Sequence, residues 1–491
     1  MCAPAASLLI LAMAPFSPTL EKGIPPLYAT DAASLDAALA ELAPTLDMAL
    51  DKGLCPEGFL RLTVRSLSDF RPERLVMLSP LLAELEAARG EAATGAPPEA
   101  LARRFPLAYR AAGMPAPSPG RPQDRGDALL DELLGMVDTG STAGAEPPDL
   151  AARFGGHKEA LLRAIRADQA FQRLEAAWNG AGLLLKQLSP GSVGTVRLAL
   201  LPLPAGDVLP AFDMAEELLA GQSPDLVLLD LPLVNTPRGM AVLERAMDLA
   251  ESLLAPLALP IGPGFLGLGG WEGLRDARYV PALLENPEYA RWRTLRTRSG
   301  AGWLALCAFP AGGGAEERGA AWLFGALCAR SMATHGRPFR FDDPDSARLA
   351  GLQDFSARHT SGGSGPDMAR LEEFARAGML PLRAGPDGGS VQAVGASAMD
   401  GGPLRPRLLL SMLAGLLIRL ADGPREDVAD IPGALVQALA DFFLRMGLPV
   451  PDDLEVTAGT PREGATPLTI SFTPDAEIHP GRGRVTFGFN W

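Results

Sequence analysis

The sequence predicts an α/β fold whose parallel sheet is covered by helices on both faces. Between residues 196 and 263, three apolar runs alternate with two helical patterns in the order strand, helix, strand, helix, strand. The runs are almost continuously apolar, which is typical of parallel strands buried on both faces. Of the 491 residues, 47% are hydrophobic, so the chain can bury a sizeable core. The expected strands are 196–204, 225–233 and 257–263, and the expected helices are 212–221 and 238–255.

The first ninety residues are expected to contribute further strands and helices. The apolar run SLLILAM at 7–13 predicts a buried strand. An export signal is the alternative, but no Lys or Arg precedes the run. A helical pattern occupies 31–50. In 58–67, Leu62 and Val64 alternate with polar residues, a period of two that predicts a half-buried strand, and a further helix follows it.

Composition divides the chain into three regions. Residues 91–126 are rich in Pro, Gly and small polar residues, as in GMPAPSPGRPQDRG, and predict a linker. This linker separates a first region, 1–90, from a third region, 127–491. The third region ends in helical patterns and in the strand-like stretches 467–474 and 482–490.

Composition also limits the function classes. The net charge of −14 argues against a chain that binds nucleic acid or inserts into an anionic membrane. Four cysteines and four histidines are scattered without a CxxC pair, so we expect no metal and no cofactor. No later segment is a convincing membrane span of ~20 apolar residues, and a reducing cytoplasm fits best.

Three short motifs are similar to catalytic sites but lack the groups that the chemistry needs. VDTGS at 137–141 matches an aspartic protease tetrapeptide, yet no second copy supplies the paired carboxylate. GPGFLGLGG at 262–270 fits neither glycine-rich phosphate motif, so a ligand there is a minor alternative to a plain strand-to-loop exit. SGGSGP at 361–366 has Pro366 where a nucleophile elbow needs glycine. We therefore expect no enzyme.

One basic segment stands out in this acidic chain, NPEYARWRTLRTRSG at 286–300. Trp292 and Leu295 are expected to pin a helix to the core while the arginines point outwards. A solvated face is the default interpretation. The functional alternative is contact with a carboxylate-bearing protein partner, because the excess of negative charge disfavours nucleic acid. The arginines concerned are Arg291, Arg293, Arg296 and Arg298.

The first helix after the expected linker is a candidate partner-binding element. In ALLDELLGMV, at 128–137, the apolar residues share one helical face opposite Asp131 and Glu132. Most such helices dock on their own domain, and the position of this one after a linker makes partner binding the alternative. The apolar face consists of Leu130, Leu133, Leu134 and Val137.

The order of motifs resembles the large subunit of the type VI secretion contractile sheath (TssC or VipB). The resemblance includes AFQRLEAAWNGAGLLL at 170–185, NPEYARWRTLRTRSGAGWLALCAFP at 286–310 and LEEFARAGMLPL at 371–382, and covers roughly 127–491. The first region resembles the small sheath subunit (TssB or VipA), most specifically in Asp-Phe-Arg-Pro at 69–72. The chain thus resembles a fusion of both subunits, a two-part sheath protomer.

This resemblance implies a structural protein of a contractile injection apparatus in the bacterial cytoplasm. Copies of the chain would form a helical tube on a baseplate, around an inner-tube protein that contraction drives forward. The arginines of 286–300 would then face another subunit or the inner tube. The helix at 128–137 stands where relatives present a helix to a ClpV-type AAA+ disaggregase. The terminal strand is expected to exchange between copies through Val485, Phe487 and Phe489.

Departures from the family pattern leave other hypotheses open. Small subunits usually carry a basic arm and another strand before the stretch that matches 7–13, so the weave between copies is expected to differ. A large-subunit phrase with arginines and a tyrosine is reduced to CAFPAGGG at 307–314. The main alternative is a sheath-derived accessory or capping protein that does not polymerise. A remote alternative is an enzyme or nucleotide binder on the strand–helix–strand unit.

Overall fold

The three-dimensional structure, a computed structural model, shows two compact units. Unit 1 combines Met1–Ala38 with Ala176–Trp491, and unit 2 is Leu39–Glu175. The sequence regions 1–90 and 127–491 each contribute residues to both units. The structure describes residues 7–18, 26–114, 149–204, 206–219, 223–277, 279–310, 319–356, 366–422, 430–460, 466–481 and 483–491.

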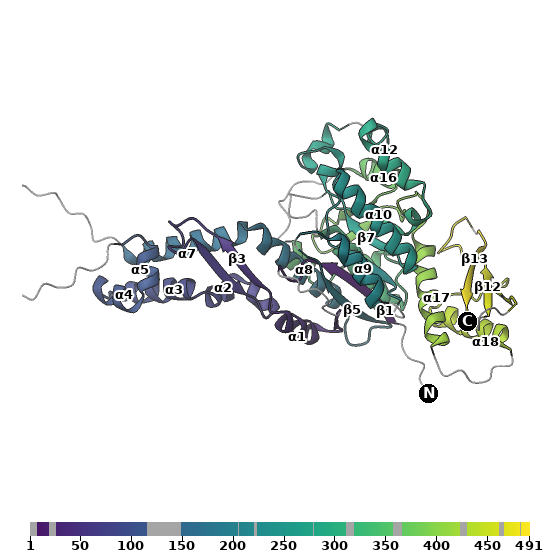
Figure 1. Cartoon of the computed structure of the whole chain (residues 1–491), viewed down its shortest axis with the longest axis horizontal. Helices are drawn as coiled ribbons and strands as arrows, with labels where there is room; N and C mark the ends of the chain where they lie inside the picture. The colour runs from purple at the N-terminus through teal and green to yellow at the C-terminus, as the bar shows by residue number, and fades with distance from the viewer. Residues whose placement is uncertain are drawn as a thin grey trace, which may run out of the picture. The chain divides into compact units, whose positions relative to one another are not determined.

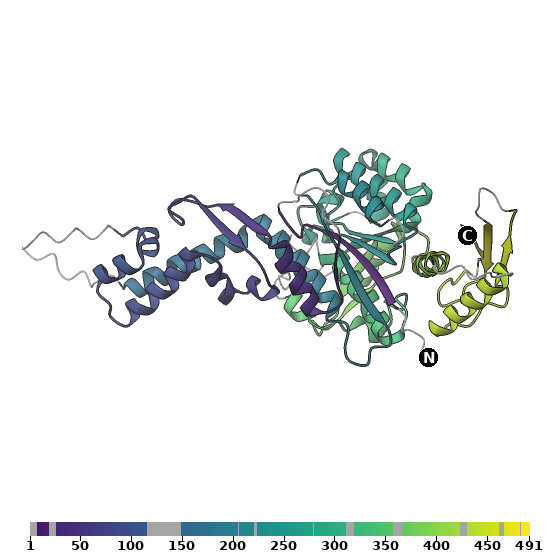
Figure 2. The same cartoon turned by 60° about the horizontal axis from the view of Figure 1, so that its bottom comes forward.

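Unit 1 is built on an eight-stranded sheet with the order β10-β9-β8-β7-β6-β1-β5-β2 (Figures 1 and 2). The strands from β9 to β5 run parallel to one another, and antiparallel β10 and β2 form the two edges. The predicted α/β fold with a parallel sheet is confirmed. The strands are β1 (Ser7–Ala14), β2 (Leu27–Ala29), β5 (Thr195–Pro202), β6 (Leu226–Leu229), β7 (Leu257–Pro260), β8 (Leu304–Ala308), β9 (Leu380–Ala384) and β10 (Val391–Ala393).

The N-terminal strand β1 lies in the middle of this sheet, between β5 and β6, and is the purple strand of Figure 2. Ile10 is level with Leu198 on β5 and with Leu226 on β6. Every residue of β1 after Ser7 is buried, as an unbroken apolar run predicts for a central parallel strand. The buried strand expected at 7–13 is confirmed.

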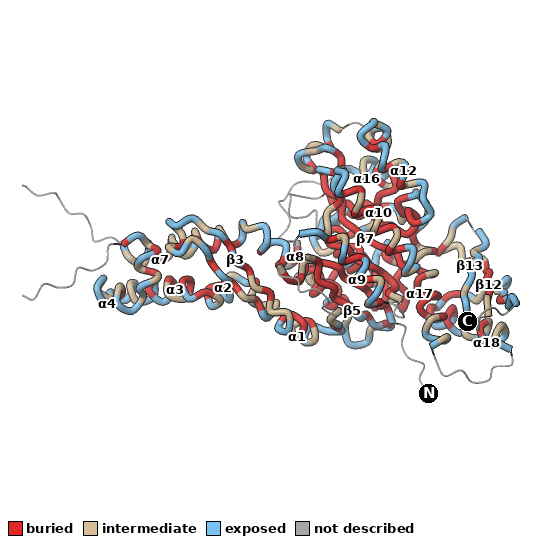
Figure 3. Tube along the Cα trace, viewed as in Figure 1, coloured by how far each residue is buried: buried red, intermediate tan, exposed pale blue. Residues whose placement is uncertain are grey.

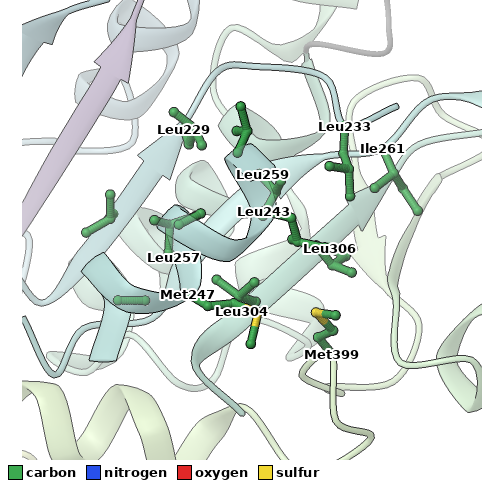
Figure 4. Close-up of a cluster of buried hydrophobic side chains, with 14 of the residues drawn as sticks. Leu229, Leu233, Leu243, Met247, Leu257, Leu259, Ile261, Leu304, Leu306 and Met399 are labelled. Atoms are coloured by element: carbon green, nitrogen blue, oxygen red, sulfur yellow. The ribbon is translucent and has the colours of Figure 1, made fainter. Parts of the chain in front are cut away.

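Helices cover both faces of the sheet, and the strands beneath them are buried (Figure 3). On one face, Leu243 and Met247 of α10 join the apolar cluster that includes Leu257 of β7 (Figure 4). On the other face, Gly325 of α13 lies against Leu228; a Cβ there would come within 2.6 Å of the leucine Cδ1. Glycine thus allows this helix to approach the sheet closely. The longer helices that lie wholly in unit 1 are α9 (Leu209–Leu218), α10 (Pro237–Ser252), α13 (Gly319–His335), α16 (Met368–Arg376), α17 (Arg405–Ala421) and α18 (Ile431–Arg445). Two further helices, α1 (Ala32–Leu42) and α8 (Gln169–Leu185), have residues in both units.

Shorter helical turns fill the connections around the sheet. They are η2 (Pro263–Leu266), η3 (Trp271–Arg275), α11 (Val280–Leu283), η4 (Pro287–Tyr289), α12 (Ala290–Arg296), η5 (Ser299–Trp303), α14 (Pro344–Ala347) and α15 (Leu352–Ser356). Across the described part of the chain, no helix has the length and apolarity that a membrane crossing requires.

Unit 2 combines a β-hairpin with helices. The strands β3 (Thr45–Ala49) and β4 (Phe59–Thr63) are antiparallel, and Phe70 packs edge-on against Phe171 with 5.9 Å between ring centroids. Helices α3 and α7 pack against each other. The helical elements are η1 (Leu67–Phe70), α2 (Pro72–Leu78), α3 (Pro80–Ala93), α4 (Pro98–Arg104), α5 (Pro106–Ala111) and α7 (Leu150–Ala167).

Two stretches differ from the elements expected. The helix predicted over 31–50 ends at Leu42, and β3 takes its second half. Pro44 disfavours helical backbone at the preceding Ala43, which has a φ of 39°. Within the range predicted as a linker, α4 and α5 are helical. Each begins with a proline at its first position, where the missing N–H costs nothing, so these prolines start helices.

The end of the chain, residues 430–491, forms what we refer to as the C-terminal block. It contains α18 and a three-stranded antiparallel sheet in the order β11-β12-β13 (Figure 1). Phe443 of α18 packs edge-on against Phe472 of β12, with 5.4 Å between ring centroids. The strands expected at the end of the chain are confirmed as β12 (Pro467–Phe472) and β13 (Val485–Asn490), which follow β11 (Glu455–Ala458).

Candidate protein interfaces

The basic segment 286–300 is anchored by two aromatic side chains. Tyr289 and Trp292 are each only 1% exposed. Trp292 lies edge-on to the ring of Phe265, with centroids 5.3 Å apart, and the Tyr289 hydroxyl donates to the Phe265 carbonyl at 2.9 Å. Burial raises the pKa of the Tyr289 phenol, which keeps the donating proton in place. The expectation that Trp292 pins this helix to the core is confirmed.

Phe265 belongs to the glycine-rich stretch 262–270, for which a ligand site is the minor alternative in the sequence analysis. In the structure this stretch contains the short η2 turn, which Gly267 ends with a φ of 71°. Phe265 and Leu266 point into the core. The stretch therefore supports α12 through contacts from Phe265 to residues 24 and 27 positions further along the chain, which no sequence motif predicts.

The expectation that the arginines point outwards is wrong for two of the four, which turn back onto their own unit. Arg293 donates through Nη1 to the carbonyl oxygens of Leu284, at 2.7 Å, and Asn286, at 2.9 Å. Arg296 donates through Nε to the carbonyl of Met399 at 2.8 Å. Carbonyls at the ends of helices and turns lack partners of their own, and a guanidinium satisfies them well. These two side chains therefore fasten α12 to its surroundings.

The other two arginines lie on the surface and pair with acids of α10. Arg291 reaches Glu244 at 3.1 Å, and Arg298 reaches Glu244 at 2.6 Å and Asp248 at 3.2 Å. The side chains of Arg291 and Arg298 are 48% and 43% exposed. Exposed pairs of this kind contribute only ~0.2–1 kcal/mol each, so they can exchange partners at little cost. We refer to Arg291, Arg298, Glu244 and Asp248 as the α10–α12 charge cluster.

The cluster continues towards α9. Arg245 pairs with Asp213 and also lies 3.7 Å from Asp248. Glu244 and Asp248 are four residues apart on α10, so helical periodicity alone places them on one face. No pattern in the sequence predicts that they pair with arginines about fifty residues further along the chain. The result is a surface of mixed charge.

The terminal strand β13 is an edge of its sheet. Phe487 is level with Ile470 on β12, and the last residue, Trp491, exchanges hydrogen bonds with Thr466 at 2.8 and 2.9 Å. Val485, Phe487 and Phe489 share one half-buried face. Among the described strands, none pairs with the outer edge of β13. The hydrogen-bonding groups of that edge are thus available to another strand.

The apolar face of the helix expected at 128–137 lies outside the described residues. It consists of Leu130, Leu133, Leu134 and Val137. The protease-like motif at 137–141 lies outside them as well. Within the described residues, no group of three or more His, Cys, Asp or Glu side chains is arranged to hold a metal ion.

Comparison with known proteins relates the centre of the chain to one family. Residues 157–311 match the family described as VipB: EvpB/VC_A0108, tail sheath N-terminal domain. The matched stretch runs from α7 through β8 and includes the α10–α12 charge cluster.

A curated relative points the same way. Over 152 residues the chain is 23% identical to the type VI secretion system sheath protein TssC1 of Pseudomonas aeruginosa. This match spans 28% of the chain and 30% of the relative. Together the two matches support a relation between part of this chain and the large subunit of the type VI secretion sheath, and the family match places that part at residues 157–311.

Proposed function

We propose that this chain is a structural subunit of a contractile sheath of the type VI secretion kind. The observation that carries the proposal is the match of residues 157–311 to a tail sheath domain. The family so described is a structural component and not an enzyme. We propose further that copies of the chain surround an inner-tube protein on a baseplate and drive the tube by contraction.

In this proposal the work comes from contacts between copies. Contacts between unlike surfaces that do not close into a ring generate helical filaments. A packed protein lattice has discrete arrangements, so many copies can convert together from an extended lattice to a shorter one. The α10–α12 charge cluster and the outer edge of β13 are the surfaces that we propose for these contacts, with another subunit or the inner tube as the partner.

We also propose that the chain unites a small-subunit-like part, 1–90, with a large-subunit-like part, 127–491. The position of β1 supports this idea, because a strand from the first part pairs with β5 and β6 inside the family-matched stretch. Fusion would make the pairing intramolecular and thus raise the effective concentration of the two parts. The cytoplasm of a bacterium is the proposed compartment.

Electron microscopy of the purified full chain tests the main proposal. We expect long striated tubes in negative stain, alone or with the inner-tube protein. A concentrated sample that contains only discrete small particles would instead support the accessory or capping alternative, which the reduced phrase CAFPAGGG at 307–314 favours. Turnover of a nucleotide by the same sample would revive the enzyme alternative.

A further inference from the structure

A cluster of charged side chains lies where the C-terminal block meets the rest of unit 1. Its centre is Glu477, in the connection between β12 and β13. Arg337 and Arg340 come from the segment that follows α13, and Arg405 comes from the start of α17, far from Glu477 in the sequence. We refer to this cluster as the Glu477 clasp, and it consists of Arg337, Arg340, Asp342, Arg405 and Glu477.

Three guanidinium groups converge on Glu477. Arg340 Nε lies 2.6 Å from one carboxylate oxygen, and Arg337 Nη2 lies 3.4 Å from the other. Arg405 donates through Nη1 to the main-chain carbonyl of Glu477 at 2.6 Å. Arg405 also pairs with Asp342. The loop before β13 is therefore held from several directions at once.

The same clasp holds the end of α18. Arg337 donates through Nη1 to the carbonyls of Met446, at 3.0 Å, and Gly447, at 2.8 Å. Its side chain is only 10% exposed, and its own carbonyl accepts from the Ser331 hydroxyl at 2.7 Å. Leaving a buried guanidinium without its partners is strongly unfavourable, so the Arg337 side chain is held in this position. Arg337 thus fixes two segments of the block relative to α13.

The C-terminal block has its own apolar interior besides this clasp. Leu468 and Ile470 of β12 are buried, and Phe443 packs on Phe472. Of the residues of the block that the structure describes, none belongs to the apolar cluster under α9 and α10. Ile478, next to Glu477, is buried and gives the loop an apolar anchor that does not depend on charge.

We propose that the Glu477 clasp is a polar latch that sets the orientation of the C-terminal block relative to the sheet of unit 1. Guanidinium hydrogen bonds are planar and directional, whereas apolar contacts alone permit sliding. Without the latch the block stays folded but samples other orientations. Since β13 belongs to the block, the latch also sets the direction in which its outer edge faces. This inference concerns the single chain and holds whether or not the chain forms a sheath.

Distance measurements between two spin labels test the latch. The labels are attached to cysteines placed at the exposed positions Glu217 on α9 and Ala434 on α18 of the full chain, with Cys2 replaced by Ser. The described native cysteines, Cys55, Cys307 and Cys328, are buried and so protected from labelling. We expect one narrow distance distribution in this parent. Glu477→Gln, which keeps the side-chain size and removes the charge, should broaden and shift the distribution.

A matched control and a second variant complete the test. Glu455→Gln removes the same charge from the same block, where Glu455 pairs with Arg484 inside the block, and should leave the distribution as in the parent. Arg340→Gln removes the closer of the two ion pairs of the Glu477 carboxylate and should broaden the distribution even if Glu477→Gln fails to fold. Unchanged distributions in the folded Glu477→Gln and Arg340→Gln variants would overturn the proposal, and so would equal broadening by Glu455→Gln.

Discussion

The four arginines of the segment 286–300 fall into two groups of two that have different partners. Arg293 and Arg296 donate to main-chain carbonyls of their own unit, whereas Arg291 and Arg298 pair with exposed acids of α10. The spacing of the arginines in the sequence does not predict which of them contact the fold and which lie on the surface. Their surroundings make the first pair part of the fold and leave the second pair available to a partner.

This difference predicts opposite outcomes for two double variants. Arg293→Ala with Arg296→Ala should lower the thermal unfolding midpoint, because hydrogen bonds from a charged group contribute about 1–3 kcal/mol each. Arg291→Glu with Arg298→Glu should leave the midpoint within a small margin and reduce the yield of filaments seen by electron microscopy. Abundant normal filaments from the charge-reversed variant would contradict the proposed contact.

Asp225 predicts a pH dependence of stability. It is buried at the start of β6, where its carboxylate accepts from the Leu9 amide at 2.7 Å. Burial raises the pKa of this carboxyl from 3.8 to about 6, although the Leu9 hydrogen bond acts in the opposite direction. The folded state therefore binds more protons than the unfolded state between these values, and its stability falls as pH rises through them.

Asp225→Asn should remove this dependence while the amide oxygen still accepts from Leu9. Relative to that variant, the parent should lose on the order of 2–3 kcal/mol of unfolding free energy between about pH 4 and pH 7. Denaturant unfolding at a series of pH values measures the difference. Asp452→Asn, at an exposed site, serves as the control. A constant difference between parent and Asp225→Asn across this range would show that the buried carboxyl does not titrate as expected.

At the level of elements, β13 has one paired and one open edge. Trp491 and Thr466 exchange two hydrogen bonds, and such pairs alternate along an antiparallel ladder. The amides of Thr486 and Gly488 therefore point away from β12, towards the open edge. If β13 joins a strand of another copy, these amides are the donors that it uses.

Thr486→Pro removes one outward donor without removing a hydrogen bond to β12, and proline is tolerated on an edge strand. We expect this variant to fold normally and to form few or short filaments. Thr486→Ala is the matched control, because both changes remove the contact between the Thr486 and Ser471 hydroxyls, which are 3.0 Å apart. Equal filament yields from the two variants would argue against strand pairing at this edge.

At the scale of the whole molecule, we expect assembly and disassembly to depend on different parts of the chain. The proposed lattice contacts lie in unit 1, while the expected helix 128–137 belongs to the stretch between α5 and α7 and lies outside the described residues. If a ClpV-type disaggregase binds the apolar face of that helix, a change there should leave tube formation intact and prevent extraction.

Leu130→Asp with Leu134→Asp should therefore form tubes that a ClpV-type unfoldase no longer pulls down or dissolves, because charges cannot enter an apolar groove without a large desolvation cost. The control is Asp131→Ser with Glu132→Ser, on the opposite face of the expected helix, which should behave like the parent. Intact binding of the leucine variant in the pull-down would remove this helix from consideration.

Particular elements show how far the sequence can be interpreted alone. The run at 7–13 could be predicted as a buried strand, and Trp292 as an anchor, because apolar character and helical spacing are local properties. The end of α1 at Leu42 was missed, although Pro44 was a usable signal. No local pattern predicts that Trp292 packs against the ring of Phe265. Nor does any local pattern predict that Arg296 donates to the carbonyl of Met399.

The sequence by itself determined the strand–helix alternation and the doubly covered parallel sheet, because burial on both faces leaves an unbroken apolar run in each strand. Only the tertiary structure decided that β1 enters the sheet between β5 and β6, although about 180 residues separate it from β5. It also decided that Arg293 and Arg296 serve the fold. It brought three other arginines, Arg337, Arg340 and Arg405, to Glu477. Hydrogen bonds and ion pairs between distant segments depend on where the chain returns in space, and that return leaves no periodic trace in the order of residues.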